Sequence, residues 1–212
     1  MEVINDLSRD VVTFFRVCQN HYEELVRYLR FMVVSRAWYD LLQHTDPETL
    51  TDVQRAARFL FLQKTSYAGR VVKQNFRYSS SQIPNFRPDK IPEALEDTHA
   101  RLFGVQIECL PYEKVLEKYD RNTTFHFLDP PYWQRRLYQF NFTPDDFRTL
   151  ASRLQKIKGK FLLTLDDHPE IRKIFGMFEI RPFQMTYSSQ RKPGRRYQEL
   201  FISNYRLPSQ SA

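Results

Sequence analysis

Asp129-Pro130-Pro131-Tyr132 follows directly on the apolar run Thr124-Phe125-His126-Phe127-Leu128. The run predicts a short buried strand, and the two prolines exclude both a helix and further strand pairing after the acid. The strand therefore ends in a stiff turn, residues 129–132, which we call the elbow. In open α/β sheets, ligands bind beyond the carboxyl ends of the strands. We interpret the elbow as a ligand site; the alternative is a proline turn with an incidental acid and a packing tyrosine.

The elbow offers two hydrogen-bond acceptors and one flat ring. The carboxylate of Asp129 and the carbonyl of Pro130 can both accept from an amine, and Pro131 restrains the backbone that carries them. The ring of Tyr132 can stack on a planar base. These groups suit a flat base that bears an exocyclic amine.

Hydrophobic spacing and capping signals around the elbow alternate between strand and helix. We expect strands at residues 2–6, 105–109, 124–128, 161–165, 178–187 and 197–205. We expect helices at residues 7–18, 35–43, 51–62, 92–103, 112–119, 143–154 and 168–175, with irregular structure at 68–91. Strands that alternate with helices and end in a hairpin predict an α/β fold with a mainly parallel sheet and one antiparallel edge.

The distribution of charge indicates an anionic partner more clearly than the formal net charge of +7 on 212 residues does. No acid lies between Asp52 and Asp89, where the basic residues are Arg55, Arg58, Lys64, Arg70, Lys73, Arg77 and Arg87. The aromatic residues interleaved with them are Phe59, Phe61, Tyr67, Phe76, Tyr78 and Phe86. This mixture favours a nucleic-acid surface over a membrane surface, and a solvated basic helix face is the alternative. We expect DNA contacts from Arg70, Lys73 and Arg77 and, at the tip of the C-terminal hairpin, from Arg191, Lys192, Arg195 and Arg196.

Cys18 and Cys109 lie in apolar stretches without the spacing of metal ligands. We interpret both as reduced core thiols of an intracellular protein. The sequence shows no signal peptide or membrane-spanning stretch. We therefore expect a cytoplasmic protein with neither a metal nor a membrane partner.

With these motifs in place, the chain resembles the DNA adenine methyltransferase family, which methylates the exocyclic amine of adenine with S-adenosylmethionine. The resemblance is carried by residues 2–7, 127–132, 163–168 and 200–204. It implies a class I methyltransferase sheet formed by residues 1–29 and 105–206, with residues 30–104 inserted as a target-recognition domain. It also implies double-stranded DNA as the partner.

The same resemblance implies roles for individual residues. Asp129 and the Pro130 carbonyl would accept hydrogen bonds from the target amine, and Tyr132 would stack on a base flipped out of the duplex. Asp6, at the end of the first strand, matches the acid that contacts the cofactor ribose, although it could instead cap the following helix. Glu108 and Cys109 match the segment near the cofactor adenine, where this chain has Pro111 in place of an expected acid.

The chain departs from the family in its glycines. The family carries a Phe-x-Gly-Gly-type loop that cradles the methionine end of the cofactor, on a central strand between the strands that end at Asp6 and Asp129. The five glycines here, at positions 69, 104, 159, 176 and 194, form no such loop. Without that strand two half-sheets would have open edges, so we expect a second polypeptide to supply it, or a degenerate copy of the enzyme.

Three readings of the function therefore stay open. The first is an adenine-specific DNA methyltransferase, or the catalytic and recognition part of one. The second is a related enzyme that acts on RNA; enzymes of this kind that act on glutamine typically have Asn before the prolines, which Asp129 disfavours. The third is a catalytically inactive protein that binds DNA or a partner. The recognition sequence and the role in restriction, phage protection or regulation cannot be read from the chain.

Overall fold

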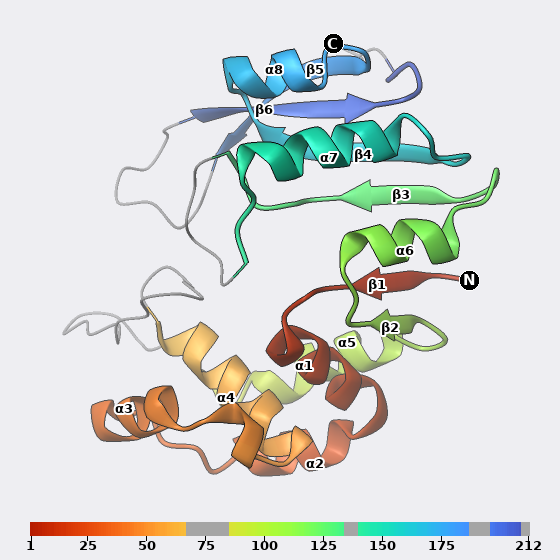
Figure 1. Ribbon diagram of the computed structural model, residues 1–212. Coiled ribbons are helices and arrows are strands. Elements are labelled where there is room, and N and C mark those ends of the chain that lie inside the picture. Colours follow the sequence, from red (N-terminus) through yellow and green to blue (C-terminus); the bar gives the residue numbers. More distant parts are fainter. Residues whose placement is uncertain (67–84, 134–139, 187–195, 209–212) are drawn as a thin grey trace. The chain divides into compact units, whose positions relative to one another are not determined.

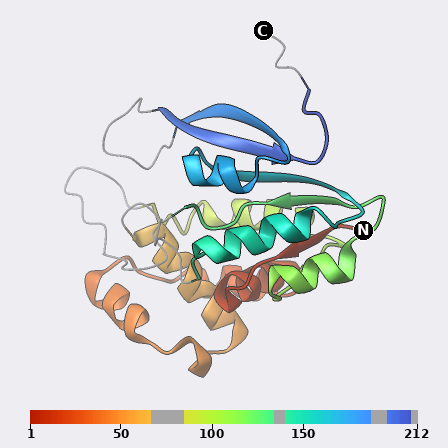
Figure 2. The same cartoon turned by 45° about the horizontal axis from the view of Figure 1, so that its top comes forward.

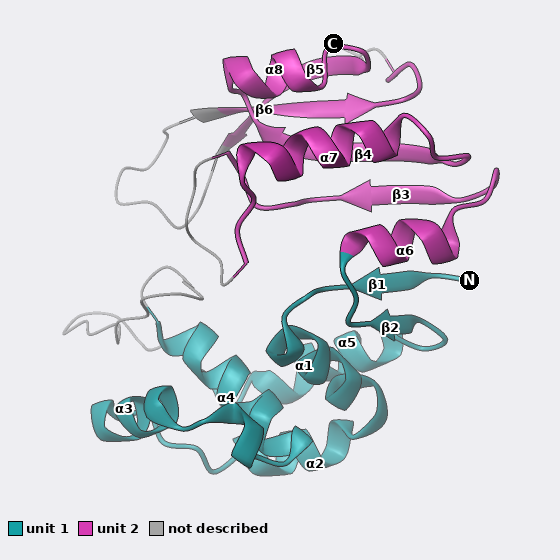
Figure 3. Ribbon diagram, viewed as in Figure 1, with its two compact units in different colours: residues 1–111 teal, residues 112–212 magenta. Residues whose placement is uncertain are grey.

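The computed structural model describes residues 1–66, 85–133, 140–186 and 196–208 (Figure 1). The chain divides into two compact units, Met1–Pro111 and Tyr112–Ala212 (Figure 3). The expected boundaries of the recognition domain, 30–104, stay a prediction. Within the described ranges, no helix is long and apolar enough to cross a membrane.

The first unit is mainly helical. Its two short strands, β1 (Val3–Asn5) and β2 (Gln106–Glu108), pair in parallel, with Val3 opposite Gln106 and Asn5 opposite Glu108. Between them the chain forms α1 (Arg9–Asn20), α2 (Tyr22–Leu29), α3 (Arg36–His44), the 3-10 turn η1 (Pro47–Thr49), α4 (Asp52–Thr65) and α5 (Ile91–Arg101). The core of this unit includes Val17 and Cys18 of α1, Leu25 of α2, and Ala56 and Phe61 of α4.

The helix ends of this unit follow the capping signals in the sequence. The side chain of Ser35 accepts a hydrogen bond from the Trp38 N–H and begins α3. Thr51 and Gln54 form a capping box that begins α4, since each side chain accepts from the backbone of the other. Gly104, with φ of 73°, lies just beyond α5, in a backbone conformation that favours glycine.

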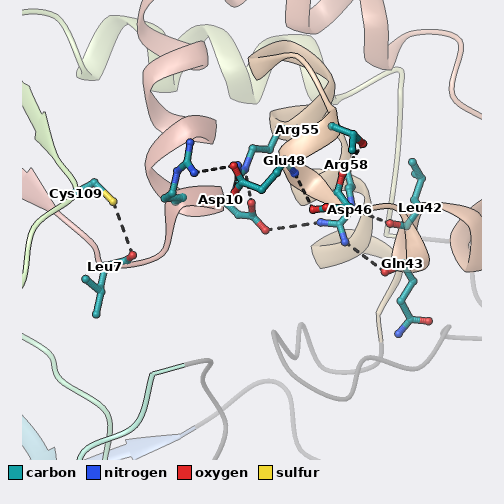
Figure 4. Close-up of polar contacts among 11 residues, drawn as sticks. Leu7, Asp10, Leu42, Gln43, Asp46, Glu48, Arg55, Arg58 and Cys109 are labelled. Atoms are coloured by element: carbon teal, nitrogen blue, oxygen red, sulfur yellow. Dashed lines mark hydrogen bonds and ion pairs between the residues drawn. The ribbon is translucent and has the colours of Figure 1, made fainter.

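Two basic residues of the predicted nucleic-acid stretch are structural. The guanidinium of Arg55 is buried between α1 and η1, with Nε 2.5 Å from Asp10 Oδ1 and another nitrogen 2.9 Å from Glu48 Oε1 (Figure 4). Arg58 Nε donates to the Leu42 carbonyl at 2.6 Å. These two arginines fit neither of the two expectations for the basic stretch, a nucleic-acid surface or a solvated helix face. Ion pairs and hydrogen bonds to helix-end carbonyls hold them inside the unit.

Two of the interleaved aromatic residues are also structural. Phe61 and Phe86 are buried, and their ring centroids lie 5.0 Å apart in an edge-to-face arrangement. Their expected exposure on a nucleic-acid surface was therefore wrong. A helix that packs on other helices must bury apolar residues at helical spacing, and Phe61 lies on that face of α4.

The second unit is an α/β layer. It contains α6 (Tyr112–Tyr119), β3 (Phe125–Leu128), α7 (Pro144–Leu154), β4 (Lys160–Asp166), α8 (Pro169–Ile174), β5 (Glu179–Thr186) and β6 (Arg196–Ser203). The sheet order is β3-β4-β6-β5, with β3 parallel to β4 and the other two pairs antiparallel. Helices α7 and α8 lie on the same face of this sheet (Figures 1 and 2).

The two faces of this sheet differ in chemistry. On the face covered by α7 and α8, β4 contributes Leu163 and Leu165, opposite Ile202 and Leu200 of β6, and all four are fully buried. On the other face, Thr164 lies opposite Phe201 and Asp166 lies opposite Glu199. Alternation along the strands therefore carries polar side chains to the end of β4 that adjoins the elbow.

The end of α6 is tied to the start of β4 by Asp120. Its carboxylate accepts from the backbone N–H groups of Lys158 at 2.7 Å and Gly159 at 2.9 Å, and it lies 3.4 Å from the His126 ring. A Cβ on Gly159 would lie 2.4 Å from the Thr124 carbonyl oxygen, so only glycine fits this close approach.

The fold confirms the α/β class. The described strands form two sheets, which contain two parallel pairs and the antiparallel C-terminal hairpin. The parallel pairs are β1–β2 and β3–β4, so antiparallel pairing is as frequent as parallel pairing. The missing central strand stays a prediction.

Candidate active site

The elbow follows β3, and one hydroxyl group holds its acid. Thr164 Oγ1, on the neighbouring strand β4, donates to Asp129 Oδ1 at 2.6 Å. Thr164 is buried, whereas Asp129 is exposed. Among the described residues, none donates a hydrogen bond to the second carboxylate oxygen of Asp129 or to the Pro130 carbonyl. Within the described part of the chain, the two acceptors predicted from the sequence therefore keep capacity for a further hydrogen bond.

The aromatic part of the elbow is anchored to the same sheet. The Tyr132 hydroxyl donates to Glu199 Oε2 of β6 at 3.0 Å, and the Trp133 N–H donates to Asp166 Oδ1 at the end of β4 at 2.8 Å. The Trp133 ring is buried and packs against Phe147 of α7, with a centroid distance of 5.2 Å. Three polar groups of the sheet thus hold the elbow: Thr164, Asp166 and Glu199.

The first unit has a second cluster of predicted site residues, where its two parallel strands end. The Asp6 N–H donates to the Glu108 carbonyl at 3.4 Å, and the side chain of Asn5 exchanges two hydrogen bonds with the backbone of Leu110. The backbones of Asp6 and Glu108 therefore adjoin where the two strands end, and the assignment of Asp6, Glu108 and Cys109 as cofactor residues stays a prediction. Carboxylates at the carboxyl ends of parallel strands suit the hydroxyl groups of a ribose.

Asp6 does not occupy the N-cap of the following helix. Ser8 occupies that position, and Asp6 Oδ1 accepts from the Ser8 N–H at 2.7 Å. The carboxylate orders the turn into α1 while it stays exposed to solvent. Asp6 therefore does not cap the helix, which was the alternative to ribose binding. Its carboxylate instead accepts a hydrogen bond from the residue two positions further along the chain.

The two cysteines differ in environment. Cys18 is completely buried in α1, and burial raises the pKa of its thiol to about 12, as expected for a core residue. Cys109 is exposed, with its sulfur 3.7 Å from the Leu7 carbonyl oxygen (Figure 4). The interpretation of Cys109 as a core thiol was wrong, because β2 ends at Glu108 and the chain turns outward there.

The predicted DNA-binding residues lie largely outside the described residues. This applies to Arg70, Lys73, Arg77, Arg191, Lys192 and Arg195. Arg196 is the first residue of β6. In the described part of the chain, no group of three or more histidine, cysteine or acidic side chains could hold a metal ion.

Sequence reasoning missed the three residues that hold the elbow. Their signal was present, because Thr164 and Asp166 interrupt the apolar strand at 160–166, and Glu199 interrupts the run at 196–203. A polar residue inside a buried strand needs a partner, so it indicates a specific contact. The partner could not be named, because 35 residues separate Thr164 from Asp129 and 67 separate Glu199 from Tyr132.

Comparison with known proteins agrees with this geometry. The family model for the D12 class of N6 adenine-specific DNA methyltransferases matches residues 1–189, most of the chain. The chain therefore belongs to this family, whose members generally use S-adenosylmethionine. It is similar to the Type II methyltransferase M.MjaIII of Methanocaldococcus jannaschii, with 24% identity over 189 residues that cover 76% of this chain. The match spans 64% of the length of that relative.

Proposed function

We propose that this chain transfers a methyl group to the exocyclic amine of adenine in double-stranded DNA. The observation that carries the proposal is the elbow: Thr164 fixes Asp129 through one oxygen, while the other oxygen and the Pro130 carbonyl have no hydrogen-bond donor among the described residues. Both acceptors belong to one rigid turn after a strand, so an amine can donate to the two of them together. The family match supports adenine as the target.

The chemistry explains why acceptors suffice. The lone pair of the adenine amine is delocalised into the ring, which makes the amine a weak nucleophile. Hydrogen bonds from the amine to Asp129 and to the Pro130 carbonyl restore electron density on nitrogen as the new bond forms. A carboxylate of ordinary pKa cannot remove a proton from the neutral amine first, so positioning and electrostatics supply most of the acceleration.

Tyr132 would provide the surface that receives the base. A base inside a duplex cannot reach a methyl donor, so adenine must leave the stack and find a flat apolar partner elsewhere. Tyr132 lies two residues after Pro130 in sequence, and its ring is partly buried. Stacking on this ring would present the amine edge to Asp129.

S-adenosylmethionine would supply an activated methyl group on a sulfonium centre. We propose that Asp6 accepts hydrogen bonds from its ribose hydroxyls, with Glu108 and Cys109 beside it. The exposed carboxylate of Asp6 and the adjoining end of β2 fit this role. The 212 residues contain no pair of consecutive glycines to cradle the methionine end.

We propose that a further segment, on the same or another polypeptide, completes the cofactor site and adds a strand. Among the described strands, β1 and β2 pair with each other alone, and a two-stranded sheet is marginal by itself. Strand β3 pairs with β4 alone among the described strands, and its Phe125 and Phe127 are exposed. An added strand would pair such an open edge.

The test of the proposed site is Asp129→Ala, with Asp129→Asn beside it. Transfer of a labelled methyl group to duplex DNA is measured together with DNA affinity, in a preparation that contains any completing segment. Losing a preorganised polar contact of this kind costs roughly a hundredfold or more in rate. We expect that loss in both variants, with DNA affinity within a few-fold of the wild type.

Asp145→Asn is the matched control, because this acid lies in the same unit with its side chain 88% exposed and should not alter the rate. A complex that keeps near-normal turnover after Asp129→Ala would refute the assignment. The same assay with RNA as the substrate tests the alternative that the chain is an RNA methyltransferase. Methyl transfer to RNA and not to DNA would identify an RNA enzyme. Cofactor and DNA binding without any transfer would favour the inactive reading.

A further inference from the structure

Glu199 is a buried acid in a central strand. Strand β6 has β4 on one side and β5 on the other, and Glu199 lies opposite Asp166 of β4 and Phe183 of β5. Only 2% of its surface is exposed. An acid in such a position is costly unless it is hydrogen-bonded, so its contacts indicate what retains it there.

One of the contacts of Glu199 is with the elbow. Its Oε2 accepts from the Tyr132 hydroxyl at 3.0 Å. The prolines of the elbow fix the backbone before Tyr132, but they leave its side-chain torsions open. A hydrogen bond from the far end of the ring to a strand paired on both sides removes that freedom.

The orientation of the ring matters for the proposed reaction. A base that stacks on Tyr132 takes its tilt from the ring, and the amine must then meet the acceptors of Asp129 and Pro130 together. A misplacement of about 1 Å can cost on the order of a hundredfold in rate. Asp166 adds a second restraint, because it holds the backbone N–H directly after Tyr132.

We propose that Glu199 is a positioning residue that sets the orientation of the Tyr132 ring for the target base. This inference rests on the proposed function and extends it to a residue outside the elbow. Glu199 acts through the Tyr132 hydroxyl and does not touch the substrate. A purely structural acid would stabilise the sheet without affecting the orientation of the ring.

The test compares Glu199→Leu, which removes the acceptor, with Glu199→Gln, which keeps an acceptor of the same size. Three quantities are measured: kcat for methyl transfer, DNA affinity, and the fluorine NMR signal of fluorotyrosine at position 132, assigned by its loss in Tyr132→Phe. We expect Glu199→Leu to lower kcat by roughly 10- to 100-fold with DNA affinity unchanged. In this variant we also expect the Tyr132 signal to shift or broaden. Glu199→Gln should keep kcat within about threefold of the wild-type value and should keep the Tyr132 signal at its wild-type position.

The control is Glu179→Leu, at the first position of β5 in the same sheet, where the side chain is 44% exposed. It should leave all three quantities unchanged. Tyr132→Phe keeps the stacking ring and removes only the hydroxyl, so it should lower kcat as much as Glu199→Leu does. In the Tyr132→Phe background, Glu199→Leu should cause no further loss.

Three results would overturn the proposal: full turnover in Tyr132→Phe, an additive loss in the double variant, or an unchanged Tyr132 signal in Glu199→Leu. The first of these decides the matter even if Glu199→Leu does not fold. If the wild type never transferred a methyl group, the proposed function would be refuted. If its Tyr132 signal still depended on Glu199, the contact between the two side chains would nevertheless be established. The two failures are therefore distinguishable.

Discussion

Among the described residues, the hydroxyl group of Thr164 is the donor that holds the Asp129 carboxylate. We predict that Thr164→Val lowers kcat by roughly tenfold, because the unheld carboxylate must then be ordered during the reaction. Thr164→Ser keeps the hydroxyl and should retain most of the rate. Steady-state kinetics on duplex DNA would measure both, with Thr98→Val as the control, since the Thr98 hydroxyl donates to the Ala94 carbonyl of its own helix. Equal rates in the Val and Ser variants would contradict the prediction.

The sequence alone suggested the groups that we propose to act in the reaction, but it did not suggest the residues that hold them. The groups of Asp129-Pro130-Pro131-Tyr132 that could act on a ligand are adjacent in sequence and follow an apolar strand. A local sequence pattern is therefore enough to suggest this site. Thr164 and Glu199 act across strands, and only the register of β4 with β6 shows that they share a face. The exposure of Cys109 was also missed, because an apolar neighbourhood in sequence does not fix where a strand ends.

Asp120 joins two structural elements of the second unit, and this predicts how stability depends on pH. Burial would raise the pKa of its carboxyl, but hydrogen bonds from the Lys158 and Gly159 N–H groups, with a contribution from His126, hold that pKa below its usual value. An acid with a lowered pKa in the folded state stabilises the fold above its unfolded pKa of about 4. That stability is lost as the pH falls through the lower, folded pKa.

We predict that Asp120→Asn destabilises the chain by about 1–3 kcal/mol at neutral pH, because an amide cannot accept from both N–H groups without presenting a donor to one of them. Denaturant unfolding at pH 7 and again near pH 3 would measure the difference. The gap between the variant and the wild type should narrow at the lower pH. Asp145→Asn should behave like the wild type at both values.

Helix ends were more predictable than helix surfaces. The helices expected at residues 35–43, 51–62 and 143–154 start with Ser35, Thr51 and Thr143, and each of these side chains accepts a hydrogen bond from the first turn of its helix. The basic side of α4 was misread, because the buried Arg55 pairs with Asp10 of α1, 45 residues away in sequence, and with Glu48 of η1. Charge along one helix does not reveal which acids a neighbouring helix presents to it.

For the molecule as a whole, we predict that residues 70–77 carry part of the affinity for DNA. Replacing Arg70, Lys73 and Arg77 by Gln should weaken binding and reduce its dependence on salt, since each lost phosphate contact lowers counterion release by about one ion. Binding titrations across a range of salt concentrations would measure the slope. Replacing Lys114, Arg148 and Arg153, which form ion pairs within the second unit, removes the same charge and serves as the control. An equal change of slope in both variants would indicate a general effect of charge.

We also predict that these 212 residues alone bind S-adenosylmethionine weakly. Adding a polypeptide with a Phe-x-Gly-Gly-type loop should tighten binding and raise the melting temperature, because a strand would pair with an open sheet edge. Calorimetric titration and thermal melts, with and without that polypeptide, would measure the effects. Tight binding by the chain alone would show that Asp6, Glu108 and Cys109 hold the cofactor without the loop.

The register of the C-terminal hairpin has a consequence for how related chains can vary. Strand alternation places Glu199 on one face of the sheet and Leu200 and Ile202 on the face that α7 and α8 cover. Inserting or deleting one residue within β6 would turn Glu199 into the apolar core and Leu200 out of it. Changes of length should therefore accumulate in the segment between β5 and β6, residues 187–195. Relatives could exchange that basic segment, and with it DNA preference, while the elbow and its supports stay the same.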